Sequence, residues 1–159
     1  MALASYYREI MKINEMEDSQ NKADASKALF EKLNRESLPE YFNWTEEVFE
    51  GIHVKERGSQ AALLWVDLDT DQERHFTYSE LAGKGNQFVN FLRSHGVKKG
   101  DSVYMMIPSV PESWFASLAT IKAGWVSVPT AMNMTERELE YRFATYPPEA
   151  IWRTKPRRR

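Results

Sequence analysis

The fold class follows from residues 100–129, which are GDSVYMMIPSVPESWFASLATIKAGWVSVP. Residues 103–107 form an uninterrupted apolar run that a proline ends, as expected of a strand buried on both faces. A helix should follow, with Pro111 in its first turn and Gly124 just beyond its end. Residues 125–128 then form a second short apolar strand. A strand, a helix and a strand in this order are typical of parallel strands joined by a right-handed crossover.

The helix before this segment has the clearest pattern. Thr77 and Glu80 have the spacing of a capping box, in which each side chain bonds the backbone N–H of the other residue. Apolar residues follow at intervals of three and four on one helix face: Tyr78, Leu81, Ala82, Gly85, Phe88, Val89 and Leu92. Gly96 occupies the place of a C-terminal cap. We expect a helix over residues 78–95, with Gly85 allowing it to approach the sheet closely.

Two regions precede this helix. Residues 1–38 form a polar, charged arm whose apolar residues are spaced for two helices, the second capped by Asp24. Residues 61–66 and 74–78 should pair as a hairpin whose first strand is buried. The acidic turn between them begins as an EF-hand calcium loop does, but it lacks the glycine and the glutamate that such a loop needs. A solvent-exposed turn is the better interpretation.

Two more capping boxes are expected at the helices that follow the two parallel strands. Ser109 pairs with Glu112 in the first, and Thr135 pairs with Glu138 in the second. The predicted fold class is therefore α/β, a parallel sheet with crossover helices that a helical arm precedes.

Composition limits the classes of function. The 159 residues carry a net charge of −2, which gives no electrostatic reason to expect nucleic acid or an anionic membrane as partner. No cysteine is present, so disulfides, thiolate catalysis and cysteine-bound metals are excluded. Apolar runs are too short to span a bilayer, and the acidic N-terminus has no targeting pattern. We expect a cytoplasmic protein with no nucleic-acid and no membrane partner.

Residue types and spacing alone assign no catalytic residue and no metal ligand. His53, His75 and His95 share no spacing typical of metal ligands. Gly83 and Gly85 lack the third glycine of a dinucleotide-binding loop and lie inside a predicted helix. From these patterns the chain is an α/β domain of unassigned function.

Three stretches, taken in order, carry a resemblance. They are PEYFNW at residues 39–44, HFTYSEL at residues 75–81, and residues 96–129 with the lysine-alanine-glycine turn at residues 122–124. With the EYR segment at residues 140–142, they resemble the N-terminal portion of medium-chain acyl-CoA synthetases, which are AMP-forming members of the adenylate-forming superfamily. The resemblance implies an incomplete N-terminal subdomain of that fold.

The resemblance divides the chain into a helical arm (1–38), the N-terminal part of the large synthetase domain (39–143) and a non-matching basic tail (144–159). Family enzymes convert a carboxylate, ATP and CoA to acyl-CoA, AMP and pyrophosphate through an acyl-adenylate, and Mg²⁺ offsets the phosphate charge. Their phosphate loop and catalytic lysine lie beyond the matching region, and neither occurs here. The resemblance thus implies a ligase segment, inactive alone, that binds no cofactor well and packs against the remainder of the synthetase polypeptide.

One residue is expected near a ligand. The loop after the second parallel strand leaves the carboxyl end of the sheet, where open α/β sheets bind ligands. In the family, a residue that aligns with Asn133 approaches CoA. The alternative is that Asn133 caps the following helix.

The resemblance ends after residue 143, where TYPPEAIWRTKPRRR begins at residue 145. Pro147 and Pro148 should end the helix, and a basic tail replaces the strand that the family has at this point. We expect residues 144–159 to be disordered or docked irregularly. A truncated or frame-shifted synthetase product is one interpretation. The alternative function is a non-catalytic interaction module, or a partner subunit of a split synthetase.

Overall fold

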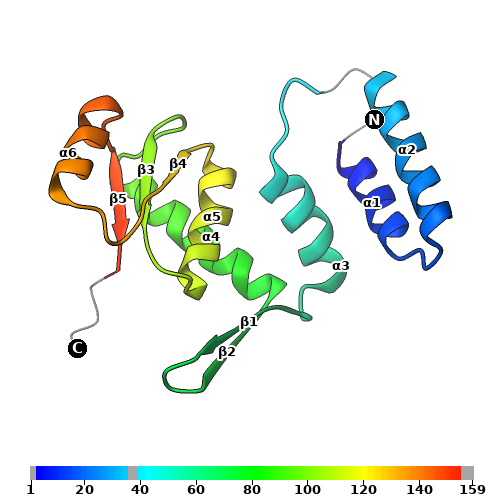
Figure 1. The fold of residues 1–159 in the computed structure, drawn as a ribbon, viewed down its shortest axis with the longest axis horizontal. Coiled ribbons are helices and arrows are strands. Elements are labelled where there is room, and N and C mark those ends of the chain that lie inside the picture. The colour runs from blue at the N-terminus through cyan, green and yellow to red at the C-terminus, as the bar shows by residue number, and fades with distance from the viewer. Residues whose placement is uncertain (1–2, 36–38, 155–159) are drawn as a thin grey trace.

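The computed structural model describes residues 3–35 and 39–154. The elements in chain order are α1 (Leu3–Asn14), α2 (Ser19–Arg35), η1 (Thr45–Val54), α3 (Lys55–Arg57), β1 (Ala61–Asp67), β2 (Gln72–Thr77), α4 (Tyr78–Ser94), β3 (Ser102–Met106), α5 (Pro111–Ala123), β4 (Val126–Pro129), α6 (Glu136–Thr145) and β5 (Ala150–Arg153). Helices α1 and α2 form the arm, and residues 39–154 form the body (Figure 1). No helix in the described ranges is both long and apolar enough to cross a membrane.

Strand β3 is the centre of a parallel sheet with the order β4-β3-β5. Tyr104 on β3 lies opposite Val128 on β4 and Ile151 on β5. Helices α4 and α5 cover one face of this sheet, and α6 covers the other (Figure 1). The predicted α/β class, with parallel strands and crossover helices, is confirmed.

The main core lies between β3 and the pair α4 and α5. Val103 and Met105 pack there among alanines of α5 and apolar residues of α4. The Phe88 ring is at its centre, with its centroid 6.5 Å from that of Trp125 and 4.7 Å from that of Trp152, both in edge-to-face geometry. Such aromatic pairs add to the stabilisation that burial alone provides.

Helix α4 follows its predicted pattern closely. Thr77 and Glu80 form the expected capping box, in which Thr77 N donates to the Glu80 carboxylate at 2.8 Å. Gly96 follows the helix with a φ of 89°, a conformation that favours glycine. Gly85 does allow a close approach, but to α5 rather than to the sheet, since a Cβ there would lie 3.5 Å from Leu118 Cβ. The predicted partner was wrong because Gly85 lies on the side of α4 that packs against α5, and its nearest neighbours are Leu118 and Phe115.

Helix α5 does not begin with the predicted capping box. Val110 is the N-cap residue and provides no side-chain cap, so the pairing of Ser109 with Glu112 is wrong. Ser109 and Glu112 instead contact residues of the hairpin formed by β1 and β2. Arg74 forms an ion pair with Glu112 at 3.1 Å, and Trp65 Nε1 donates to Ser109 O at 2.8 Å.

Two expectations for the N-terminal half are also wrong. Helix α2 begins at Ser19, and Asp18 rather than Asp24 acts as its cap, because Asp18 Oδ1 accepts from Asn21 N at 2.7 Å. The first turn of α2 is polar, so apolar spacing could not reveal it. Strands β1 and β2 pair as predicted, but β1 is not buried, and Leu64 is 56% exposed.

The expectation of an irregular tail is wrong for β5. Helix α6 ends at Thr145 as Pro147 and Pro148 predict, yet the chain then pairs with β3. Ser102 Oγ donates to Pro147 O at 2.6 Å, and Glu149 N donates to Ser102 O, so the chain is directed along β3. The prolines end the helix without preventing a strand after it. The basic residues at 155–159 lie outside the described residues.

One element, η1, has no counterpart among the predicted ones. It is π-helical, and its buried residues pack against α4 and α5: Thr45, Val48, Phe49, Ile52 and His53. Asn43 Oδ1 accepts from Glu46 N, and Asn43 N donates to the Glu47 carboxylate, so Asn43 caps the helix start. Apolar residues at 48, 49 and 52 have helical spacing, which was the signal available in the sequence.

Candidate functional site

The carboxyl ends of β3 and β4 meet at one edge of the sheet. Thr130 begins the loop after β4; it is buried, and its N–H donates to Met105 O at 3.1 Å. The connection after β3 leads to α5 on one face, and the connection after β4 leads to α6 on the other (Figure 1). Connections that diverge in this way leave room for a ligand at the carboxyl edge.

Asn133 lies in a turn of the loop between β4 and α6, and it is exposed. It does not cap α6. Thr135 is the N-cap residue, and it forms the predicted capping box with Glu138. The capping alternative for Asn133 is therefore wrong.

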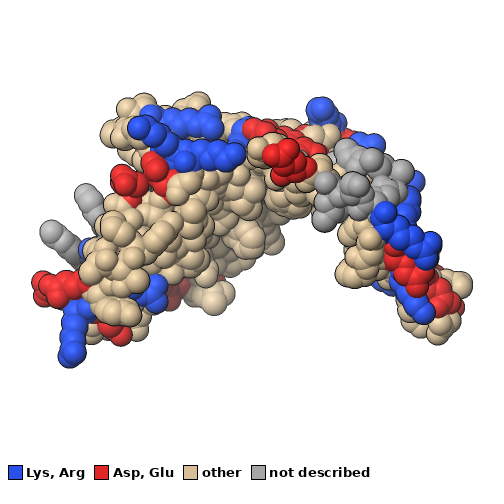
Figure 2. Space-filling model, turned by 90° about the horizontal axis from the view of Figure 1, so that it is seen from above, with Lys and Arg blue, Asp and Glu red and all other residues tan. Residues whose placement is uncertain are grey.

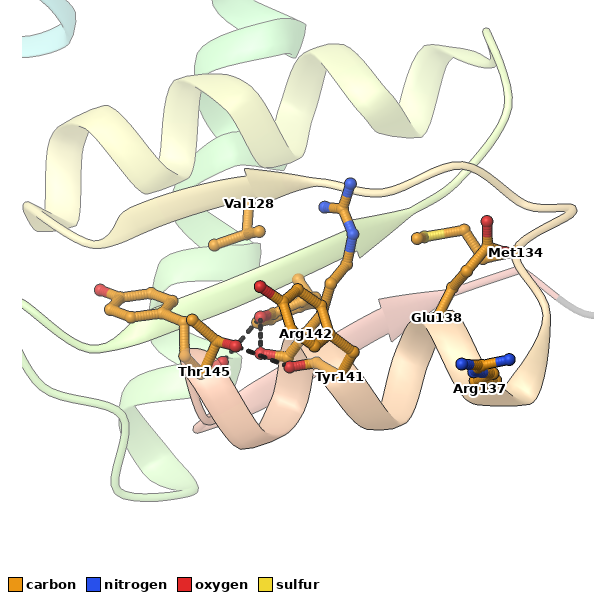
Figure 3. Close-up of a pocket in the computed structure, with 9 residues that line it drawn as sticks. Val128, Met134, Arg137, Glu138, Tyr141, Arg142 and Thr145 are labelled. Carbon is orange, nitrogen blue, oxygen red and sulfur yellow. Dashed lines mark hydrogen bonds between the residues drawn. The ribbon is translucent and has the colours of Figure 1, made fainter.

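A pocket of about 680 Å³ lies next to this loop, between α6 and the sheet (Figure 3). Strand residues form its floor, α6 forms its wall, and the end of the loop forms its rim. We call it the α6 pocket, and its lining residues are Tyr104, Val128, Met134, Arg137, Glu138, Tyr141, Arg142, Thr145 and Tyr146. Tyr104 is buried, whereas most of the wall is exposed, so the pocket is an open groove.

Tyr104 fixes α6 against the sheet. Its hydroxyl donates to Tyr146 O at 2.7 Å, where α6 has ended, and lies 3.4 Å from Arg142 O. Its ring meets Phe143 edge-to-face with centroids 5.1 Å apart. The phenol thus provides a hydrogen-bond donor for the Tyr146 carbonyl just past the end of α6, while Arg142 O also accepts from Tyr146 N at 2.8 Å. The floor of the α6 pocket is therefore firmly placed.

The α6 pocket has an excess of positive charge. Its one carboxylate, Glu138, accepts from Thr135 N at 2.7 Å and from Thr135 Oγ1 at 2.8 Å. The backbone N–H of Thr135, and then its hydroxyl, lower the pKa of Glu138 below its ordinary value. Arg137 and Arg142 form no ion pair with any described residue. A pocket whose lining contains two arginines and the aromatic side chain of Tyr104 suits a ligand that carries phosphate and an apolar portion.

The structure does not bring the three histidines together, and within the described ranges no group of three His, Cys, Asp or Glu side chains could hold a metal ion. His75 lies 3.2 Å from the Glu73 carboxylate on the hairpin, and His95 is at the end of α4. His53 is buried in η1, a role that sequence spacing could not suggest because η1 itself was not predicted.

Comparison with known proteins agrees with this geometry. Residues 52–156 match the family described as AMP-binding enzyme, and this range includes β5. The chain is 50% identical over 110 residues to 4-hydroxybutyrate–CoA ligase 1 of Metallosphaera sedula, a match that covers 69% of this chain and 20% of that protein. It is 30% identical over 110 residues to the mitochondrial acyl-coenzyme A synthetase ACSM3 of Homo sapiens, covering 66% of this chain and 19% of that one.

A solved structure supports the same assignment. The N-terminal subdomain of Klebsiella oxytoca NpsA in complex with anthranilyl-AMSN superimposes with a TM-score of 0.57 at 28% identity, covering 66% of this chain and 26% of that one. The chain spans about a fifth of the length of the relatives named above. The matched range includes the core, the sheet and the α6 pocket, so the chain belongs to the AMP-binding enzyme family and corresponds to the N-terminal portion of an AMP-forming acyl-CoA synthetase.

Proposed function

We propose that the whole protein converts a short- or medium-chain carboxylate, ATP and CoA to acyl-CoA, AMP and pyrophosphate, and that this chain contributes to the CoA side of the site. The observation that carries the proposal is the pair Arg137 and Arg142 without ion-pair partners, in a pocket next to the loop of Asn133. CoA carries phosphates at one end and a long pantetheine arm, which match the charge and the aromatic floor of the α6 pocket.

The adenylation half of the reaction requires residues beyond these 159. The sequence contains no Ser/Thr/Gly-rich phosphate loop. We therefore propose that ATP and Mg²⁺ are bound by another part of the synthetase, which packs against this chain. We place the reaction in the cytoplasm, where ATP and CoA are both available.

A chimeric ligase would test the proposal. The matching segment of a ligase such as 4-hydroxybutyrate–CoA ligase 1 is replaced by residues 39–154 of this chain, and both half-reactions are then measured. Removing an uncharged hydrogen-bond partner of CoA by Asn133→Ala should raise the KM for CoA about tenfold, which corresponds to about 1.4 kcal/mol. Arg142→Gln should have an equal or larger effect, because a charged hydrogen bond is lost. Carboxylate-dependent ATP–pyrophosphate exchange should not change in either variant.

Asn90→Ala is the matched control, because Asn90 is an exposed asparagine on α4, away from the α6 pocket. An unchanged KM for CoA in both Asn133→Ala and Arg142→Gln would refute the CoA contact. A chimera that folds but catalyses neither half-reaction would favour the alternative of a non-catalytic interaction module.

A further inference from the structure

Strand β1 has one edge without a strand partner. It is the longest of the described strands, and within the described part of the chain it pairs with β2 alone. Apart from its ladder with β2, the backbone of residues 61–66 forms no hydrogen bond with another described element. The outer edge of β1 is therefore a row of backbone N–H and C=O groups on which another strand can pair.

The other strand edges carry features that discourage such pairing. On the same hairpin, β2 presents the exposed charged residues Glu73 and Arg74. In the parallel sheet, the edge strands β4 and β5 have four residues each, and they contain Pro129 and Arg153. Short strands, prolines and charged side chains all protect an edge. Residues 61–66 are AALLWV, a stretch without charge and without proline, so β1 lacks this protection.

The face of β1 that points away from the body is apolar. Side chains alternate along a strand, so Leu64 and Val66 share one face, and Leu68 follows them at the start of the turn. Their exposed fractions are 56%, 38% and 88%. The opposite face is covered by the body, because Trp65 Nε1 donates to Ser109 O at 2.8 Å. Exposed apolar side chains beside an unpaired edge indicate a surface that another chain covers.

The arm leaves this surface uncovered. Figure 2 shows the arm diverging from the body, and in Figure 1 the arm lies apart from the hairpin. The hairpin itself lies at the margin of the body, with the turn between β1 and β2 directed away from α3 (Figure 1). A second molecule can therefore reach the edge of β1.

This edge is complementary to itself. Antiparallel pairing of two copies about a two-fold axis keeps the exposed faces of both copies on the same side of the sheet. Leu64 is the middle residue of β1, so full overlap places it opposite Leu64 of the second copy. Ala62 then lies opposite Val66, and Leu63 lies opposite Trp65, so each of these cross-strand pairs is apolar.

The charges at the two ends of β1 favour the same arrangement. Lys55 and Arg57 in α3 precede the strand, and Asp69 and Asp71 lie in the turn that follows it. Antiparallel pairing brings the turn of one copy toward α3 of the other, so opposite charges approach at both ends. Parallel pairing would bring like charges together instead. Lys55 and both aspartates are exposed, so their attraction is modest and serves mainly to select the antiparallel direction.

We propose that two copies of this chain associate through β1 and form a continuous antiparallel four-stranded sheet in the order β2-β1-β1-β2. The contact uses the unpaired backbone groups of β1 and buries Leu64 and Val66. The new sheet ends at β2 in both copies, where charged side chains prevent the addition of a further strand. The assembly is therefore a closed dimer.

Analytical ultracentrifugation of the full chain tests the dimer. Between about 1 and 100 μM it should find an equilibrium between monomer and dimer. Leu64→Lys removes two apolar contacts and places two ammonium groups opposite each other, so the dissociation constant should rise by about tenfold or more. His75→Lys is the matched control, because His75 lies opposite Leu64 on β2 and is exposed. It should leave the dissociation constant unchanged.

Three results would overturn the proposal. A native chain that stays monomeric over this range would exclude the second copy and favour another part of the synthetase as the occupant of the edge. Oligomers larger than a dimer would contradict a sheet that ends at β2. An equal rise of the dissociation constant in the Leu64 and His75 variants, with unchanged circular dichroism spectra, would show that the copies associate elsewhere.

A disulfide tests the register and places no charge in the edge. The native sequence has no cysteine. Opposed residues of antiparallel strands have Cα atoms about 4.5–5.5 Å apart, which a disulfide can span. Mild oxidation of Leu64→Cys should therefore give a covalent dimer, and His75→Cys should give none. Failure of Leu64→Cys to crosslink, or equal crosslinking of both variants, would refute the proposed pairing.

The charged ends of β1 provide a test of direction. Lys55→Glu changes attraction to repulsion at both ends of the paired strands, so it should raise the dissociation constant about two- to fivefold, and less at high salt. Lys27→Glu makes the same change at an exposed position of α2 and should have no effect. Equal dissociation constants in these two variants would refute the antiparallel arrangement.

Discussion

Glu50 accepts a hydrogen bond from Lys122 Nζ at each of its two carboxylate oxygens, and both distances are 2.7 Å. Glu50 lies in η1, and Lys122 belongs to the lysine-alanine-glycine turn that ends α5. The Asn43 side chain reinforces the same contact, because its Nδ2 donates to Lys122 O at 3.0 Å. The lysine that contributes to the family resemblance therefore holds a structural position here, in which it joins η1 to the end of α5.

Breaking this ion pair should destabilise the body. The Lys122 and Glu50 side chains are 20% and 24% exposed, so water screens the pair less than it screens a surface pair. Lys122→Met should lower the free energy of unfolding by about 1–3 kcal/mol, since a partly buried carboxylate loses its charged partner. Urea unfolding would measure the change. In a double-mutant cycle with Glu50→Gln, a coupling near zero would contradict the prediction.

The pair Glu31 and Arg35 on α2 provides the matched control. Its atoms are 3.7 Å apart and its side chains are largely exposed. The same double-mutant cycle should give a coupling of about 0.3–0.5 kcal/mol there.

Removing the Phe88 ring should be among the most damaging single changes in the core. The ring is buried and contacts the indoles of Trp125 and Trp152. Phe88→Ala should cost about 3–5 kcal/mol of unfolding free energy, measured by urea unfolding. Phe91→Ala on the same helix removes a half-exposed ring and should cost well under 1 kcal/mol. Equal losses of unfolding free energy in the two variants would show that the buried face of α4 has been assigned wrongly.

Helix α4 was predicted from the sequence and η1 was not, because the two segments differ in how strongly their local sequence signals favour a helix. In α4 a capping box, a continuous apolar stripe and a terminal glycine all favour the same helix. In η1 the buried residues are separated by charged ones, and Gly51 adds a residue of low helix propensity. Strand β5 was missed for a different reason. The run of basic residues at the chain end predicted a solvated tail, although only Arg153 among these residues lies in β5.

Part of the site could be predicted and part could not. The loop at the carboxyl edge follows from the order of strands and helices, and the capping box of Thr135 follows from local spacing. The positions of Arg137 and Arg142 beside Tyr104 depend on which face α6 covers, which depends in turn on β5. The polar links of His53 join segments 46 residues apart in the case of Tyr7, and local spacing carries no sign of such contacts.

Thr77 and Ser109 both have the sequence spacing of a capping box, but only Thr77 forms one in the structure. Substituting each residue tests this difference. Thr77→Ala removes a cap that is present and should cost about 1 kcal/mol of unfolding free energy. Ser109→Ala should be nearly neutral, because Val110 is the N-cap residue of α5 and provides no side-chain cap. Thermal or urea unfolding of both variants would measure this. A larger loss in Ser109→Ala than in Thr77→Ala would contradict the assignment.

The same cap has a predictable pH dependence. The Thr77 backbone N–H, followed by the Thr77 hydroxyl, lowers the pKa of Glu80 from its ordinary value of 4.5. The contribution of Glu80 is therefore fully present above pH 4.5 and is lost as the pH falls through the lowered pKa of the folded state. The stability difference between the native chain and Glu80→Gln, measured from pH 6 to pH 3, should shrink with acidification. A stability difference that grows as the pH falls from 6 to 3 would contradict this prediction.

The 159-residue chain should not catalyse carboxylate-dependent ATP–pyrophosphate exchange. It contains no phosphate loop to hold the transferring nucleotide, and preorganised groups at that position provide most of the stabilisation in such reactions. Radiolabelled pyrophosphate incorporation into ATP, with a series of short and medium-chain carboxylates, would measure it. Exchange above the level of a heat-denatured sample would refute the prediction.

The last prediction concerns β5, where the sequence and the structure disagree most. Within the described part of the chain, strand β5 lies at the sheet edge and pairs with β3 alone. Its backbone amides that point toward β3 should therefore exchange slowly with deuterium. Trp152 faces Phe88 across the main core, whereas Ile151 is half-exposed on the α6 face. Trp152→Ala should therefore abolish the slow exchange of residues 150–153, and Ile151→Ala should leave most of it. If the amides of β5 in the native chain exchange as fast as those of the exposed turn between β1 and β2, that result would contradict this prediction and support an irregular tail.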